Sequence, residues 1–223
     1  MNAAINEFSR DGDPAVRGFL HSPGTPTGDG LLLTHGAGAN CRAPLLVSLA
    51  ETFAAQGYTV LRFDLPFRQK RPKGPPLRSS KEDQEGIRKA VVAIRDVIGG
   101  RIFLGGHSYG GRQSSILAAS EPTLCDGLVL LSYPLHPPQK PAELRTAHFP
   151  ELRTPSLFVH GSRDGFATQD ELTDALRLVP ATTRLLQVTG AGHELLSKKN
   201  EKDLPAMIFG AFVSMFPRQN RES

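Results

Sequence analysis

The stretch Ile102-Phe103-Leu104-Gly105-Gly106-His107-Ser108-Tyr109-Gly110-Gly111 decides the fold. Its apolar start is typical of a buried strand, and the residues from Tyr109 onward are typical of a helix over 109–120. A serine on a sharp turn between strand and helix must adopt a strained backbone, and side chains at Gly106 or Gly110 would collide with the neighbouring chain. The stretch therefore predicts a nucleophile elbow that exposes the Ser108 hydroxyl.

Two residues later in the chain have the chemistry that a reactive serine requires. A serine hydroxyl is a poor nucleophile at neutral pH, and His193, which follows the last predicted strand, can act as its base. The imidazole needs a carboxylate that orients it, and Asp164 follows a strand that ends near Val159. Taken singly, such residues are common in turns, surfaces and cores. Their order of Ser, Asp and His, each just beyond a different strand, predicts a catalytic triad at one edge of the sheet.

A second glycine-rich turn, Thr34-His35-Gly36-Ala37-Gly38-Ala39-Asn40, follows the apolar run 31–33. Its small residues allow the backbone to approach a substrate closely. We expect an oxyanion hole made by the N–H groups of Tyr109 and Ala37, with Gly38 as the alternative second donor. A turn of this kind can also bind phosphate, but the Lys-Ser/Thr ending of a mononucleotide-binding loop is missing.

Short apolar runs alternate with helical segments along the rest of the chain, which predicts an α/β fold with a mostly parallel sheet between helices. Residues 5–8 and 15–20 flank Asp11-Gly12-Asp13 and predict an antiparallel hairpin at the sheet edge. The proline-rich segment 134–155 predicts an ordered loop beside the site, too short for a separate cap domain. The predicted strands lie at 31–33, 60–61, 102–104, 128–131, 157–159 and 185–186, and the predicted helices at 42–56, 81–98, 109–120, 168–178 and 203–216.

The composition predicts a soluble protein of one domain, residues 1–223, in the cytoplasm. The 223 residues are 39% hydrophobic and 22% charged, no run approaches the roughly 20 apolar residues of a membrane span, and no signal peptide is recognisable. The net charge is +4, and much of the excess lies within 67–78. The core of this basic cluster has no aromatic residue on which a base could stack, so nucleic-acid binding is disfavoured. Cys41 and Cys125 fit no metal-ligand spacing and are expected to be reduced packing thiols. We expect no metal and no cofactor.

The chain resembles the α/β-hydrolase superfamily over nearly its whole length. More narrowly, it resembles the small predicted hydrolases related to testis-expressed and NSL-complex-subunit proteins, and more distantly the dienelactone hydrolases. The resemblance implies the α/β-hydrolase fold, but some relatives in that group are subunits of protein complexes. Dienelactone hydrolases use a cysteine nucleophile, so Ser108 disfavours that activity. The motifs that carry the resemblance are His35-Gly36-Ala37-Gly38, Arg62-Phe63-Asp64-Leu65-Pro66-Phe67, Gly105-Gly106-His107-Ser108-Tyr109-Gly110-Gly111-Arg112 and Tyr133-Pro134-Leu135-His136-Pro137-Pro138.

The site predicts a serine hydrolase that cleaves carboxylic esters or thioesters of small to medium acyl groups through an acyl-enzyme. Its partner would be a small-molecule substrate in a shallow, open pocket, without nucleic acid or membrane, and the oligomeric state stays open. The alternative is a catalytically silent module of the same fold that binds other proteins. An intact triad favours the enzyme, because a scaffold has no need to retain it.

Several residues are expected near the pocket. Tyr133 and His136 could line it or, equally, pack a turn against prolines. Arg68, Arg71 and Arg112 could contact an anionic substrate, but solvated loop charge for the first two and surface or structural pairing for Arg112 are favoured. The candidate pocket residues are His35, Gly36, Gly38, His107, Arg112, Tyr133 and His136.

Overall fold

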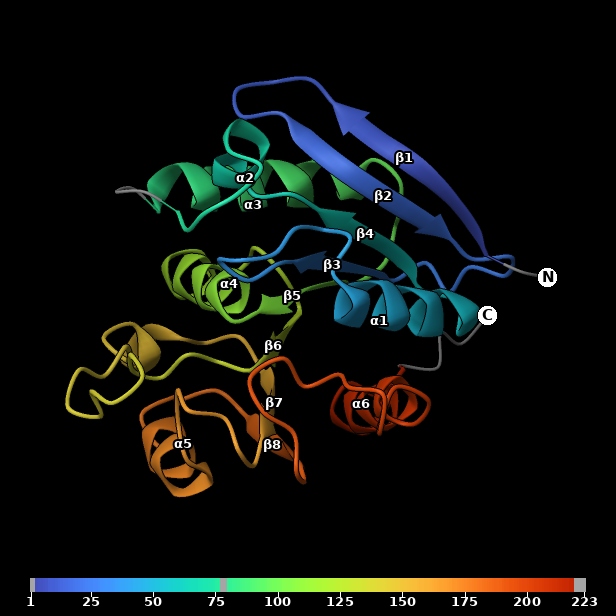
Figure 1. Cartoon of the computed structure of the whole chain (residues 1–223). Helices are drawn as coiled ribbons and strands as arrows, with labels where there is room; N and C mark the ends of the chain where they lie inside the picture. Colours follow the sequence, from blue (N-terminus) through green and yellow to red (C-terminus); the bar gives the residue numbers. More distant parts are fainter. Residues whose placement is uncertain (1–2, 77–79, 219–223) are drawn as a thin grey trace.

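In the computed structural model, which describes residues 3–76 and 80–218, eight strands form one sheet in the order β1-β2-β4-β3-β5-β6-β7-β8 (Figure 1). The pairs β1–β2 and β2–β4 are antiparallel, and the other pairs are parallel. The predicted edge hairpin is therefore confirmed. The strands are β1 (Ala4–Arg10), β2 (Val16–Ser22), β3 (Gly30–Thr34), β4 (Thr59–Phe63), β5 (Ile102–His107), β6 (Gly127–Leu131), β7 (Ser156–Gly161) and β8 (Thr183–Val188).

Helices cover both faces of the sheet: α1 and α6 pack on one face, and α3, α4 and α5 on the other (Figure 1). All five predicted helices are present, and their ends differ from the prediction by up to three residues. The sequence reading missed α2, a one-turn helix directly after β4, and the 3-10 helix η1 in the proline-rich segment. The bounds are α1 (Pro44–Ala55), α2 (Pro66–Lys70), α3 (Lys81–Arg95), α4 (Tyr109–Ser120), η1 (Phe149–Glu151), α5 (Gln169–Leu176) and α6 (Leu204–Met215).

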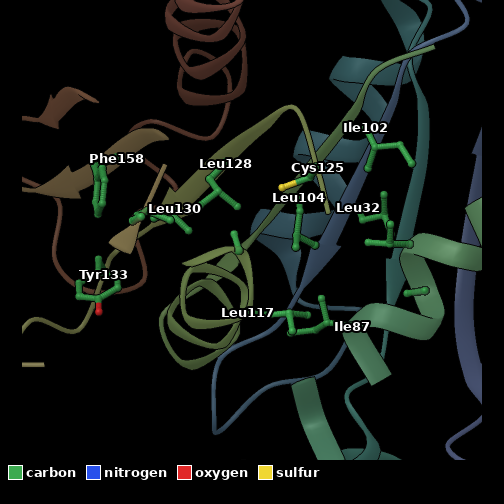
Figure 2. Packing of buried hydrophobic residues seen from close by; sticks show 14 of the residues in the cluster. Leu32, Ile87, Ile102, Leu104, Leu117, Cys125, Leu128, Leu130, Tyr133 and Phe158 are labelled. Atoms are coloured by element: carbon green, nitrogen blue, oxygen red, sulfur yellow. The ribbon is translucent and has the colours of Figure 1, made fainter. Parts of the chain in front are cut away.

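Continuous apolar runs form the parallel strands because successive side chains of a strand point to opposite faces, and both faces are buried here. In β3, Leu32 packs under α3 and α4, whereas Leu31 and Leu33 pack under α1 and α6. Figure 2 shows the first of these layers, with Leu32 and Leu104 of the sheet facing helical side chains. The two cores fix the sheet, and so the position of every loop at its edge.

Loops at the carboxyl ends of β3, β5, β7 and β8 bring distant segments to the same edge of the sheet, because these strands are parallel. Between β6 and β7 the chain forms an ordered loop that includes η1, and the described segments include no separate cap domain. Among the helices that the structure describes, none combines the length and the apolar character that a membrane crossing requires. Leu77 and Arg78 of the basic segment lie outside the described residues.

Candidate active site

Ser108 lies on the sharp turn between β5 and α4, with φ 50° and ψ −112°. Residues with a side chain rarely adopt positive φ, so this turn stores strain. The turn is held from below, because the Ser108 N–H donates to the Leu131 carbonyl over 2.8 Å. A Cβ at Gly106 would lie 2.7 Å from the Thr34 oxygen, and one at Gly110 would lie 2.6 Å from the His35 oxygen. Only glycine fits at these two positions, as the sequence predicts.

His193 joins the Ser108 hydroxyl to the Asp164 carboxylate. The Ser108 hydroxyl donates to His193 Nε2 over 2.8 Å, and Nδ1–H donates to Asp164 Oδ2 over 2.8 Å. This pair of bonds requires the neutral imidazole with its proton on Nδ1. The lone pair on Nε2 then points at the hydroxyl. The structure thus brings together the three residues that the sequence predicts. His193 is 85 residues from Ser108 and 29 residues from Asp164 along the chain.

The Asp164 carboxylate is fully buried and has two hydrogen-bond donors. Besides His193, the Phe166 N–H donates to Oδ1 over 2.9 Å. Burial alone would raise the pKa of Asp164, but the hydrogen bonds from His193 and Phe166 outweigh it and hold that pKa below its ordinary value. The side chain is therefore an anion at neutral pH, which suits it to stabilise an imidazolium.

The histidine loop is fixed to its neighbours by its backbone as well as by its side chain. His107 Nε2–H donates to the His193 carbonyl over 2.8 Å, and the Arg163 N–H donates to the Ala191 carbonyl over 2.9 Å. The ring of Phe166 packs on the His193 ring, with 4.1 Å between centroids. Burial lowers the pKa of His107 and keeps it neutral, consistent with its donor role. These contacts limit the rotation of the His193 ring.

Two backbone segments offer N–H groups beside Ser108. The Tyr109 N–H is at the first position of α4, and among the described residues it meets no acceptor, as expected in the first turn of a helix. Ala37 and Gly38 line the pocket in front of Ser108, and the described chain likewise offers their N–H groups no acceptor. The N–H groups of Tyr109, Ala37 and Gly38 are thus free to donate to a ligand within the described part of the chain.

Arg68 on α2 holds the Ala37 loop from behind. Its guanidinium donates to the carbonyls of Ala37 and Ala39, each over 2.7 Å, and to those of Arg71 and Gly74, each over 3.0 Å. The expectation that Arg68 is a solvated loop charge is therefore wrong: the residue is only 5% exposed, because four carbonyl acceptors replace water around it. Arg71 is exposed, in keeping with solvated loop charge.

Asp83 of α3 is a second anchor of the same region. It accepts the Phe67 N–H of α2 over 3.0 Å and the Tyr109 hydroxyl of α4 over 2.6 Å. Only 1% of Asp83 is exposed, and this burial raises the pKa of its carboxyl above the ordinary value. Since α2 carries both Arg68 and Phe67, this short helix connects the Ala37 loop to the elbow; we call Arg68, Asp83 and α2 the brace.

His35 strengthens the same connection from inside the core. Its Nδ1–H donates to the Gly36 carbonyl over 2.9 Å, and its Nε2 accepts the Leu65 N–H over 3.1 Å. Burial lowers the pKa of His35, so the neutral ring that can both donate and accept is favoured. His35 is fully buried beneath the loop, and it therefore shapes the pocket from behind rather than lining it.

The open pocket in front of Ser108 has a volume of about 360 Å³. Of the candidate pocket residues, Gly36, Gly38 and His107 line it. Phe166 and Glu194 line it too, and the sequence reading missed both. The full lining among described residues is Gly36, Ala37, Gly38, Ala39, His107, Ser108, Phe166, His193 and Glu194.

Tyr133, His136 and Arg112 are not among the described residues that line the pocket, so the structure favours the alternative of structural packing for each of them. Tyr133 is 1% exposed and donates its hydroxyl to the Arg145 carbonyl over 2.7 Å, and Arg112 lies beside it. His136 is 5% exposed, with Nδ1–H donating to the Pro137 carbonyl over 2.8 Å. Tyr133 and His136 thus stabilise the loop 134–155, because each satisfies a buried polar atom with a carbonyl of that loop.

Neither cysteine offers a competing nucleophile. Cys41 and Cys125 are free and buried, and burial raises the pKa of each thiol to about 12. Within 3–76 and 80–218, three or more His, Cys, Asp or Glu side chains do not gather into a metal-binding group. A larger depression of about 560 Å³ lies beside Arg17 and Gln69, and its described lining residues include no serine, cysteine or histidine.

The brace could have been found partly from sequence. Asp83 occupies the position of α3 that continues the apolar face of Ile87, Ala90 and Ile94, and a carboxylate there requires a buried partner. Pro66 is at the first position of α2, a common helix start. A helix of five residues has too little periodicity to be recognised in a sequence, so the sequence predicts a solvated loop at Arg68.

The family model described as "Alpha/beta hydrolase domain" matches residues 28–210. The chain is similar to an alpha-beta serine hydrolase homologue from Coxiella burnetii, with 15% identity over 92% of this chain and 96% of that one and a TM-score of 0.75. It is also similar to a dienelactone hydrolase from Anabaena variabilis, with 20% identity, 96% and 99% coverage and a TM-score of 0.75. A Xanthomonas campestris protein described as an a/b serine hydrolase without lid has 17% identity, 98% and 97% coverage and a TM-score of 0.74. These likenesses confirm the expected fold.

Proposed function

Because the chain belongs to the alpha/beta hydrolase domain family, we propose that it is a serine hydrolase acting on carboxylic esters or thioesters of small to medium acyl groups. The observation that carries the proposal is the unbroken line of hydrogen bonds from Asp164 through His193 to Ser108. A hydroxyl that donates to an oriented, neutral imidazole is the arrangement that acyl transfer requires.

In the first half of the reaction, Ser108 Oγ attacks the carbonyl carbon while His193 Nε2 takes the hydroxyl proton. Negative charge develops on the carbonyl oxygen, where the N–H groups of Tyr109 and Ala37 stabilise it, with Gly38 as the alternative to Ala37. The buried Asp164 anion stabilises the imidazolium. His193 then gives the proton to the leaving alcohol or thiol, and the acyl group stays on Ser108.

In the second half, His193 removes a proton from water, which attacks the acyl carbon of the ester on Ser108. The same N–H groups meet the second oxyanion. Collapse of this intermediate returns the proton to Ser108 and releases the carboxylic acid. The open front of the pocket supports this step, because water can reach the acyl-enzyme without the opening of a lid.

The finer relationship to the small hydrolases of the testis-expressed and NSL-complex-subunit group is part of this proposal, and it rests on the four motifs quoted above. We also propose one domain over residues 1–223, a cytoplasmic location and a small-molecule substrate. Two observations support a site without nucleic acid. Arg68 is buried, and Lys70 is paired with Glu82, so neither positive charge of the basic segment is free to bind phosphate groups.

Labelling with a fluorophosphonate probe, followed by peptide mass mapping, tests the proposal. We expect one adduct on Ser108 in the folded protein, none in Ser108→Ala, and hydrolysis of p-nitrophenyl acetate by the wild type alone. Folded wild-type protein that neither reacts with the probe nor hydrolyses any ester would contradict the proposal and favour the silent interaction module.

A further inference from the structure

A second cavity, which we call the side chamber, adjoins the pocket in front of Ser108. Its volume is about 250 Å³, and it is more enclosed than the pocket. The two cavities have four lining residues in common, so they lie directly beside each other. The common residues are Gly36, Ala39, His107 and Glu194.

The walls of the side chamber differ in chemistry from those of the pocket. Beyond the common residues, the chamber is formed by the start of α1 and by one residue of the histidine loop, all aliphatic. Such walls favour apolar groups, because each buried methylene contributes free energy by leaving water. These residues are Ala43, Pro44, Leu45, Leu46 and Leu196.

The position of His193 determines which half of an ester can occupy the chamber. The leaving-group atom must receive its proton from His193, and His193 and Ser108 line the open pocket, not the chamber. A leaving group therefore lies in the pocket, near Phe166. The acyl chain extends from the same carbonyl carbon, and the adjoining chamber is the enclosed apolar space available to it.

Glu194 places a negative charge among the residues that line both the pocket and the side chamber. Its side chain is exposed, and the pocket and chamber linings carry no Arg or Lys in the described part of the chain. Arg68 is turned away and bound to carbonyls. An acyl group with a carboxylate would therefore meet a like charge without a compensating cation.

We propose that the side chamber binds the acyl chain of the substrate, an uncharged aliphatic group, and that Glu194 disfavours acyl groups that end in a carboxylate. This inference rests on the proposed hydrolase function and adds the class of acyl group. Three observations favour this occupant: the chamber adjoins the pocket of Ser108, its own walls are aliphatic, and Glu194 lies in the lining that the two cavities have in common.

The length of the acyl chain is the first test. We expect kcat/KM of the wild type to rise about fourfold per methylene from p-nitrophenyl acetate to butyrate. Leu196→Phe narrows the chamber and should lower the hexanoate-to-acetate ratio of kcat/KM about tenfold. Leu178→Phe is the matched control, because Leu178 is 48% exposed after α5 and should leave the ratio unchanged. If Leu196→Phe does not fold, Ala43→Leu also places a larger side chain in the chamber and should lower the same ratio of kcat/KM.

The charge of the acyl group is the second test. p-Nitrophenyl hemisuccinate carries a carboxylate, whereas p-nitrophenyl butyrate of the same length does not. Glu194→Gln should raise the hemisuccinate-to-butyrate ratio about fivefold at low salt, and the gain should shrink as salt is added.

The outcomes separate the chamber from the activity itself. Ser108-dependent hydrolysis whose chain-length profile is the same in the wild type, Leu196→Phe and Ala43→Leu would overturn the acyl assignment and leave the hydrolase standing. An unchanged hemisuccinate ratio in Glu194→Gln would overturn the charge selection. Absence of Ser108-dependent hydrolysis for every ester would overturn the function and the acyl assignment together.

Discussion

Tyr109 donates its phenol hydrogen to Asp83 over 2.6 Å, so the residue that follows Ser108 is anchored to α3 through its own side chain. Burial and this bond raise the pKa of Tyr109 above its ordinary range, which keeps the phenol protonated as a donor. The backbone N–H of the same residue is the proposed oxyanion donor. Through Tyr109, the packing of α3 against α4 thus helps to fix the position of the proposed oxyanion donor.

Tyr109→Phe tests this connection. The change removes a partner from a buried carboxylate, so we expect a loss of about 1–3 kcal/mol in the free energy of unfolding. We also expect kcat to fall about tenfold at nearly constant KM, because the donor is less well fixed. Urea denaturation and p-nitrophenyl acetate kinetics measure the two effects. The variant Asp83→Asn, in which Tyr109 is unchanged and still has a hydrogen-bonding partner, should retain most of the wild-type activity. A stability loss with unchanged kcat would make the contact purely structural.

Arg68→Lys tests the other end of the brace. One ammonium cannot reach the four carbonyls that the guanidinium fork reaches, so the Ala37 loop should loosen. We expect kcat to fall about tenfold with little change in KM. Arg71→Lys, a change of the same type at an exposed position, is the control. Equal kinetics in the two variants would contradict a positioning role for Arg68.

Asp164→Asn tests the orientation of the base. An amide at this position can donate to Nδ1, which would hold His193 in the wrong tautomer, and we expect kcat to fall about 10⁴-fold. The rate of fluorophosphonate labelling should fall in parallel. Asp174→Asn, at an exposed position on α5, is the control. A decrease of less than tenfold in Asp164→Asn would mean that Ser108 is activated in another way.

The stability of the fold should fall in mild acid because of His21. Burial, with Arg62 nearby, lowers the pKa of His21 from 6.5 to about 4. Its Nε2 accepts from Arg62 Nε over 2.9 Å, a bond that protonation would break. Between these two pH values the unfolded chain binds a proton that the folded chain does not, so the free energy of unfolding decreases as pH falls, by at most about 1.4 kcal/mol per unit.

His21→Gln separates this effect from other groups, since an amide oxygen can accept from Arg62 without titrating. We expect a smaller decrease in the free energy of unfolding between pH 6.5 and about 4 than in the wild type. His148, whose pKa burial also lowers to about 4, contributes in the same direction to both proteins. Parallel curves of stability against pH for the two proteins would rule out His21 as a source.

The strained turn at Ser108 predicts that glycine is more stable than alanine at this position. Glycine adopts a φ of 50° without steric cost, so Ser108→Gly should be about 1 kcal/mol more stable than Ser108→Ala, while both lack the nucleophile. Thermal unfolding of the two variants measures the difference directly. Alanine and glycine variants of equal stability would show that the turn stores no strain.

The sequence predicts most of the framework, because its signals are local. The runs 31–33 and 102–104 are buried on both faces and are recognisable as strands. The elbow is recognisable because Gly106 and Gly110 occupy positions where any side chain would collide with the backbone. The convergence of Ser108, Asp164 and His193 follows from parallel strands ending at one edge. Their roles rest on geometry that the sequence predicts only in outline.

Residues that act through distant contacts were not predictable in this way. In the sequence, Arg68 is indistinguishable from the other charged residues of a basic segment. Its burial depends on hydrogen bonds to the carbonyls of Ala37 and Ala39, which are about 30 residues away along the chain. Tyr133 and His136 are close in sequence to the end of β6, yet their side chains pack into loop 134–155 instead of the pocket. Proximity to a strand end does not determine the direction of a side chain.

The five residues of α2 give this scaffold a way to lose turnover without any change in its nucleophile. Substitutions that unwind α2 would release Arg68 from the Ala37 loop and Phe67 from Asp83, and so loosen the proposed oxyanion donors, while the central sheet with its separate cores stays folded. Homologous chains sorted by the Ser-Asp-His pattern alone would then include inert members among the active ones. An inspection of the residues equivalent to Arg68 and Asp83 is a sharper criterion for dividing such a family into enzymes and pseudoenzymes.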